Sequence, residues 1–148
     1  MYYTGEGVKQ DYFKALEWGQ KAAEQGDARG QYNLGFMYYS GKGVKQDYLK
    51  AIEWYQKAAE QGVVWAQTNL GYMYYTGEGV KQDYSKALEW YQKAAEQGYA
   101  EAQYNLGTMY YTGKGVIRDY KKAKRWWRLA ADQGNENAQK NLVKLFGR

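Results

Sequence analysis

The sequence has no cysteine, proline or histidine among its 148 residues. Without cysteine there is no disulfide framework, no thiolate nucleophile and no cysteine-based zinc site. Without histidine the chain also lacks the commonest general base and metal ligand. These absences exclude much of hydrolase and metalloenzyme chemistry. We therefore expect a non-enzymatic protein that uses no metal and no cofactor.

Long apolar runs are missing as well. No stretch of about 18 apolar residues occurs, so no segment is expected to span a membrane. The first residues, Met-Tyr-Tyr-Thr-Gly-Glu-Gly, have neither the basic nor the apolar region of a signal peptide. The sequence starts in the middle of a repeat, which is consistent with a fragment, and it predicts no compartment.

The chain repeats itself every 36 residues, as Gly35, Gly71 and Gly107 show. A fixed period in this range is typical of a solenoid. The first complete copy predicts one helix over about 28–39, here called helix A, and a second over about 48–61, helix B. Gly41 separates them, because glycine tolerates the left-handed conformation at a helix C-terminus.

The two predicted helices are amphipathic. On helix B, apolar residues from Tyr48 to Ala59 recur at helical spacing and form one face. Small residues such as Gly35 let the helices approach closely, and Trp54 and Trp90 are assigned to packing. Aspartates at one register are predicted to cap each helix B: Asp11, Asp47, Asp83 and Asp119.

The period predicts an all-α fold with one domain over 1–148. It divides into a half unit at 1–26 (helix B), whole units at 27–62, 63–98 and 99–134, and a half unit at 135–148 (helix A, from about Asn135 to Phe146). Neither helix can bury its apolar face alone, so neighbouring units must stack.

The repeated pattern resembles the Sel1-like repeat family, which is related to tetratricopeptide repeats. The resemblance covers the whole chain and implies an α-solenoid, a right-handed superhelix of antiparallel helix pairs with helix A on the concave side. It also implies a scaffold or adaptor role, often in bacteria, and it names no ligand. The second whole unit carries the pattern at Ala66, Leu70, Gly71, Met73, Tyr74, Gly77, Gly79, Val80, Asp83, Tyr84, Lys86, Ala87, Trp90, Lys93, Ala94, Ala95 and Gly98.

A partly aromatic stripe on helix A is the first candidate site. An extended peptide could lay apolar side chains on its rings while hydroxyls and Asn33, Asn69 and Asn105 hold the peptide backbone. Alternatively, the tyrosines pack between units and the asparagines tie helix A to a neighbouring backbone. The predicted partner-binding residues are Tyr32, Phe36, Tyr39, Tyr72, Tyr75, Tyr104, Thr108 and Tyr111, beside Ser40, Thr68, Thr76 and Thr112.

A basic segment at 114–128 is the second candidate. Ten Lys and Arg stand against three Asp and Glu after residue 112. This segment could meet an acidic protein, an anion or nucleic acid, or it could be a solvated end of the array. Confinement to one unit disfavours nucleic acid. The predicted anion-binding residues are Arg118, Lys121, Lys122, Arg125 and Arg128, with Lys114 and Lys124 nearby.

Carboxylates recur in every unit, as Glu17, Glu53 and Glu89 do, whereas a catalytic pair should be unique and enclosed. Their repetition favours surface salt links with Lys86, Lys93 and their equivalents.

The last helix A could complete the first half unit of another molecule, head to tail. However, Val143 replaces the small Gly107, and Lys140 replaces Tyr104, which favours a solvent-facing cap. The function indicated first is a protein-interaction module that binds a peptide or partner surface along the helix A groove. The alternatives are a self-associating or consensus-like array without a ligand, and anion or nucleic-acid binding at 114–128.

Overall fold

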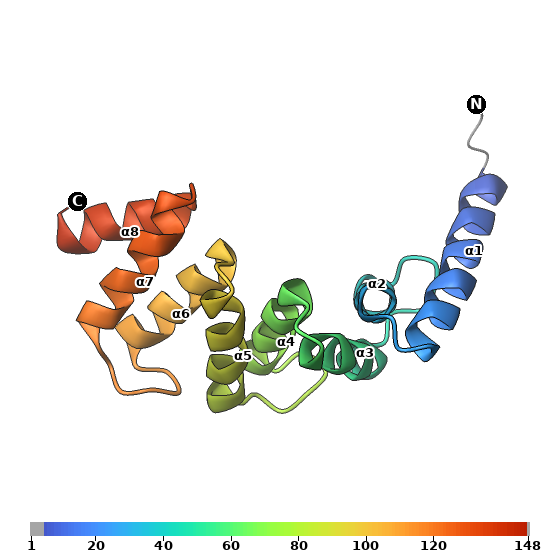
Figure 1. Cartoon of the computed structure of the whole chain (residues 1–148), viewed down its shortest axis with the longest axis horizontal. Coiled ribbons are helices and arrows are strands. Elements are labelled where there is room, and N and C mark those ends of the chain that lie inside the picture. Colours follow the sequence, from blue (N-terminus) through green and yellow to red (C-terminus); the bar gives the residue numbers. More distant parts are fainter. Residues whose placement is uncertain (1–4, 148) are drawn as a thin grey trace.

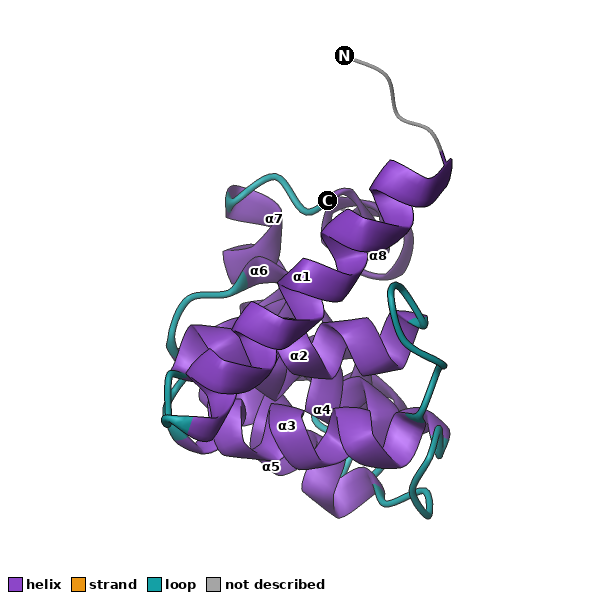
Figure 2. Ribbon diagram, turned by 90° about the vertical axis from the view of Figure 1, so that its right-hand side faces the viewer, coloured by secondary structure: helices purple, strands orange, loops and turns teal. Residues whose placement is uncertain are grey.

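The structure, a computed structural model, describes the backbone of residues 5–147 and the side chains of residues 13–147. These residues form eight helices and no strand (Figure 2), which confirms the predicted all-α fold. The helices are α1 (Gly5–Glu24), α2 (Ala28–Ser40), α3 (Tyr48–Glu60), α4 (Val64–Thr76), α5 (Tyr84–Glu96), α6 (Ala100–Thr112), α7 (Tyr120–Asp132) and α8 (Glu136–Phe146).

The helices stack in chain order and form a curved row. Helices α1 and α8 lie at opposite ends, and both ends bend to the same side (Figure 1). Within the described residues, extensive contacts join each helix to the next one in the sequence. This nearest-neighbour packing is the organisation of a solenoid.

The predicted helix ends are confirmed in the three whole units. Asp47 caps α3 by accepting a hydrogen bond from the backbone N–H of Lys50 at 3.2 Å, and Asp83 and Asp119 cap α5 and α7 in the same way. Gly41 ends α2 with a φ of 74°, in the left-handed region. Asn135 caps α8 through the backbone N–H of Ala138.

The prediction that Asp11 caps a helix is wrong. Helix α1 begins at Gly5, so Asp11 lies inside it. In the three whole units a backbone hydrogen bond fixes the loop between the helices, and in the second and third a glycine contact adds to it. The capping aspartate donates its N–H to helix A, as Asp47 does to the Tyr38 carbonyl at 2.9 Å, and Gly79 packs on Tyr48 of the unit before it. In the first copy α1 runs from Gly5 to Glu24, so no loop precedes Asp11 among residues 5–24.

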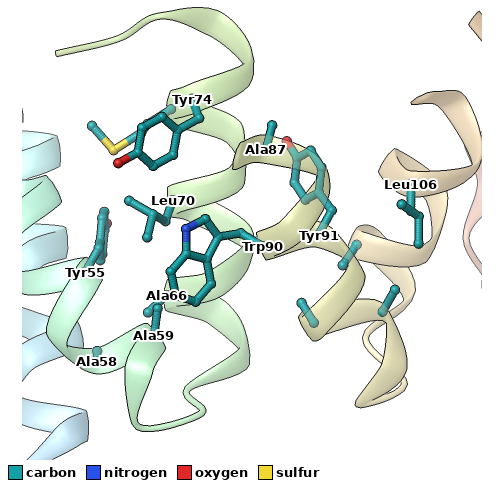
Figure 3. Packing of buried hydrophobic residues seen from close by; sticks show 14 of the residues in the cluster. Tyr55, Ala58, Ala59, Ala66, Leu70, Tyr74, Ala87, Trp90, Tyr91 and Leu106 are labelled. Carbon is teal, nitrogen blue, oxygen red and sulfur yellow. The ribbon is translucent and has the colours of Figure 1, made fainter. Parts of the chain in front are cut away.

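The core lies between helix A and helix B. Trp90 is 8% exposed and lies beside Leu70 and Ala66 of α4 (Figure 3), so its predicted packing role is confirmed. The small residues of helix A allow close approach. A Cβ on Gly107 would lie 2.5 Å from Cδ1 of Trp127, which is buried on α7.

Pairs of glutamines, one exposed and one buried, tie successive units together. Gln97 donates from Nε2 to the Gly62 carbonyl at 3.1 Å and to Oε1 of Gln67 at 2.8 Å. Gln67 in turn donates to the Ala59 carbonyl at 3.1 Å. The same arrangement recurs at the other two unit boundaries. Glutamines thus make the ties that the sequence interpretation considered for asparagines.

The repeated lysines of helix B lie on aromatic rings. The Lys86 ammonium is 5.3 Å from the centroid of Tyr74, and the Lys93 ammonium is 4.6 Å from that of Trp90. Cation–π attraction of this kind contributes about 0.5–1 kcal/mol at exposed sites. These lysines therefore contact aromatic rings of their own unit. The sequence had suggested that they form salt bridges with glutamates.

Candidate functional site

The helix A stripe comprises Tyr32, Phe36 and Tyr39 of α2 with their counterparts on α4 and α6. Phe36 and Tyr72 are 41% and 45% exposed. Trp65, which sequence reasoning missed, is 42% exposed, and its ring centroid lies 5.7 Å from that of Tyr32. Trp65 occupies the register of Arg29 and Glu101, and this variation between copies was the available signal.

The third tyrosine of each helix A packs inward. Tyr39 stacks on Tyr48 of its own unit with centroids 5.3 Å apart, and Tyr75 and Tyr111 pair likewise with Tyr84 and Tyr120. These three predicted residues are half-buried. They form one wall of the stripe, whereas Phe36 and Tyr72 project from it.

A hollow of about 230 Å³ opens in the stripe between α4 and α6. The structure brings together four predicted residues here, and it adds two that prediction had not placed in the partner-binding set. Tyr91 of α5 had the pattern of a core residue, and it is 2% exposed. The lining residues are Tyr72, Tyr75, Tyr91, Tyr104, Asn105 and Thr108.

The threonine hydroxyls of the stripe already donate hydrogen bonds within their own helices. Thr108 donates from Oγ1 to the Tyr104 carbonyl at 3.0 Å, and Thr76 donates to the Tyr72 carbonyl at 3.0 Å. A hydroxyl has one donor hydrogen and two acceptor lone pairs. These groups can therefore accept hydrogen bonds from a ligand, while Asn69 and Asn105 carry amides that can both donate and accept.

Tyr55 is the counterpart of Tyr91 one unit earlier. It is fully buried, and its hydroxyl has no hydrogen-bond partner among the described residues. Burial raises the pKa of Tyr55 well above its usual range, and the nearby Asn69 amide opposes this rise in part. The stripe thus has an unsatisfied polar group beneath its surface, next to an asparagine.

Two charged groups meet the wall tyrosines. Tyr39 donates from its hydroxyl to Oε2 of Glu78 at 2.9 Å, and Lys114 donates from Nζ to the Tyr75 hydroxyl at 3.3 Å. The pKa of Tyr39 is raised by burial and by the bond to Glu78. The bond to Tyr75 raises the pKa of Lys114. Lys114 therefore belongs to the edge of the stripe and not to the basic segment.

The basic segment divides in the structure. Lys121, Arg125 and Arg128 line a shallow hollow of about 350 Å³ on α7, together with Lys124, Leu129 and Asp132. Arg118 and Lys122 do not line this hollow. They lie against tyrosine rings instead, Arg118 on Tyr120 and Lys122 on Tyr110.

The remaining surface features have fewer side chains that could bind a ligand. A hollow of about 610 Å³ at the loop before α5 is lined by Asp83, which caps that helix, and by Lys86, which lies on Tyr74. Among the described residues, no group of three or more acidic side chains is placed to hold a metal ion. Nor does any described helix have the length and apolarity needed to cross a membrane.

A sequence model of the Sel1 repeat matches residues 1–27, 28–63, 66–99 and 100–135. The chain belongs to the Sel1 repeat family. Sel1 repeats generally mediate protein–protein interactions, and the family is a non-catalytic repeat scaffold. Among curated proteins, none matches this Sel1 chain.

Several solved bacterial structures share the fold. A protective antigen of uropathogenic Escherichia coli strains, which displays an SLR fold, is 43% identical over 92% of this chain, with a TM-score of 0.87. This chain spans only 30% of that protein. A Sel1 repeat protein from Oxalobacter formigenes is 42% identical over 87% of this chain and 97% of its own length, with a TM-score of 0.80.

Cysteine-rich protein B from Helicobacter pylori is more distant. It is 30% identical over 91% of this chain and 97% of its own length, with a TM-score of 0.69. Because the present chain has no cysteine, packing and hydrogen bonds such as the glutamine ties hold its solenoid without disulfides. The shared fold therefore does not depend on disulfides in this Sel1 protein.

Proposed function

We propose that this chain is a protein-interaction module that binds an extended peptide or partner segment along the helix A stripe. The observation that carries the proposal is the hollow between α4 and α6, lined by four tyrosines, Asn105 and Thr108. Rigid aromatic side chains that line a pocket are typical of the residues that dominate binding energy. The exposed rings of Phe36, Trp65 and Tyr72 extend this surface over two units.

The polar groups of the stripe suit a peptide backbone. Backbone N–H groups of a bound segment can donate to the threonine hydroxyls, whose own hydrogens are already used within the helix. The Asn69 and Asn105 amides recur one repeat apart and can bond both N–H and C=O groups. Side chains would then give specificity, and these main-chain bonds would hold the segment extended.

The test is a pull-down with the wild-type chain and with the double variant Tyr72→Ala/Tyr104→Ala, followed by titration of the captured partner. The double variant should lose at least tenfold in affinity, since truncating two central aromatic residues typically costs more than 1 kcal/mol each. Glu53→Ala/Glu89→Ala, at exposed positions of helix B, is the matched control and should bind like wild type. Thermal melts must show that both variants are folded. Equal binding by the two double variants would refute the proposal.

The basic hollow on α7 supports a second candidate, an acidic protein partner. Lys121, Arg125 and Arg128 converge there beside Leu129, which is 44% exposed. Such binding should weaken with salt, because exposed charges are screened beyond about 8–10 Å. Reversing Lys121 and Arg125 to glutamate should abolish capture of an acidic polypeptide such as polyglutamate. Binding that is independent of salt would refute this second function.

A further inference from the structure

We propose that the segment bound along the helix A stripe carries two features: an apolar side chain that enters the tyrosine hollow, and an aspartate or glutamate, one repeat further towards α8, that meets Lys140 and Lys144. This inference rests on the proposed function and specifies the chemistry of its partner.

The hollow fixes the first feature. Its volume of about 230 Å³ lies below the 300–1,000 Å³ of typical small-molecule pockets, so it suits a single side chain. Its lining is four tyrosine side chains with one asparagine and one threonine, and it includes no ionised group. A charged side chain would lose its hydration there without compensation. An aliphatic or aromatic residue is therefore the matching occupant.

The registers of the stripe fix the second feature. Tyr32, Thr68 and Tyr104 occupy one register of helix A, and Lys140 occupies it on α8. Phe36, Tyr72 and Thr108 occupy the next, where α8 has Lys144. At both of these positions, the neutral residues of α2, α4 and α6 are thus replaced by a lysine on α8, which lies one repeat beyond the hollow. Both lysines are exposed, and with Val143 they line one shallow surface of α8.

The acidic residues that border the stripe keep their negative charge but precede α8, where Asn137 occupies the register of Glu101. Glu101 accepts a hydrogen bond from the Tyr99 hydroxyl at 3.2 Å, and Glu78 accepts one from Tyr39. Lys114 adds a further cation at Tyr75, on the edge of the hollow. The stripe therefore runs from an uncharged aromatic part on α4 to a basic part on α8. A partner with complementary charge at that end is favoured, because such complementarity fixes register and speeds association.

The experiment is a selection of displayed random peptides of about twelve residues, which span about 40 Å when extended, on the full chain. Enriched sequences should share an aliphatic or aromatic residue and, at a constant spacing on one side of it, Asp or Glu. A synthetic peptide of the enriched sequence is then titrated by fluorescence anisotropy against the wild type and three variants. These are Tyr72→Ala/Tyr104→Ala, Lys140→Glu/Lys144→Glu and, as a control with the same charge change at exposed loop positions, Lys45→Glu/Lys81→Glu.

Lys140→Glu/Lys144→Glu should weaken binding by roughly 2- to 30-fold, as expected for two exposed ion pairs, and the Lys45→Glu/Lys81→Glu control should leave it unchanged. Changing the acidic residue of the peptide to Lys should restore binding to the Lys140→Glu/Lys144→Glu variant. Enriched peptides that need Tyr72 and Tyr104 but contain no acidic residue would overturn this inference alone. Enriched peptides whose binding is unaffected by Tyr72→Ala/Tyr104→Ala would overturn the proposed peptide-binding function itself.

Discussion

Replacing Gly107 by alanine tests whether the helix pairs are held at contact distance. The added Cβ would lie 2.5 Å from Cδ1 of Trp127 and 3.1 Å from the Ala123 carbonyl oxygen. Trp127 is 1% exposed, and its Nε1 donates to the Tyr104 carbonyl at 3.1 Å, so the ring has little room to move. Overpacking of this kind costs about 1–3 kcal/mol, whereas alanine gains about 1 kcal/mol over glycine in a helix. We expect a net loss of up to about 2 kcal/mol in the free energy of unfolding.

Gly19→Ala is the matched control, because Gly19 is also helical and a Cβ there has nothing within 4 Å. This variant should gain about 1 kcal/mol from helix propensity alone. Urea unfolding followed by circular dichroism measures both variants. Their melting temperatures should also move in opposite directions, by roughly 2–4 °C per kcal/mol. Equal stabilities for Gly107→Ala and Gly19→Ala would show that close approach does not explain the glycine in the repeat.

Three further outcomes are expected. Tyr55→Phe removes the buried hydroxyl that has no partner, so it should not lower the free energy of unfolding and could raise it by about 1 kcal/mol; a loss above 1 kcal/mol in urea unfolding would contradict this. Trp90→Ala should cost about 3–5 kcal/mol, as for other buried tryptophans, and unchanged thermal stability would show that the packing assignment is wrong. Light scattering should give the mass of one chain at every concentration, because exposed Val143 and Lys140 favour a solvated α8; a mass that rises with concentration would support head-to-tail association.

The repeat made most of the fold predictable. Comparing three copies separates the residues that never change, such as Gly71, from those that do. The helix bounds then follow from the capping aspartate and the glycine after each helix A. The same reasoning failed at Asp11, because a residue can cap a helix only where the helix starts, and α1 starts at Gly5.

The site was less predictable than the fold. Periodicity assigned Tyr91 to the core, and it is buried, yet its ring also lines the hollow. Trp65 stood outside the chosen registers, although it varies between copies as strongly as Phe36 does. Sequence patterns also cannot show which side-chain amide reaches the carbonyl of a neighbouring unit. Asparagines were considered for this bond, and glutamines such as Gln97 make it. These are questions of side-chain reach, which helical spacing does not specify.

The glutamine ties affect how cooperatively the chain unfolds. Each tie joins one unit to the unit before it: Gln97 donates to the Gly62 carbonyl of the preceding unit and to Gln67 of its own unit. Replacing Gln97 should therefore weaken one unit boundary and one bond within the unit 63–98, and leave the other units unchanged. A chain altered at Gln97 would then be able to melt in two steps, with the boundary between α3 and α4 as the point of separation. The glutamine ties thus contribute to the cooperativity of unfolding together with the apolar core, which crosses the same boundary.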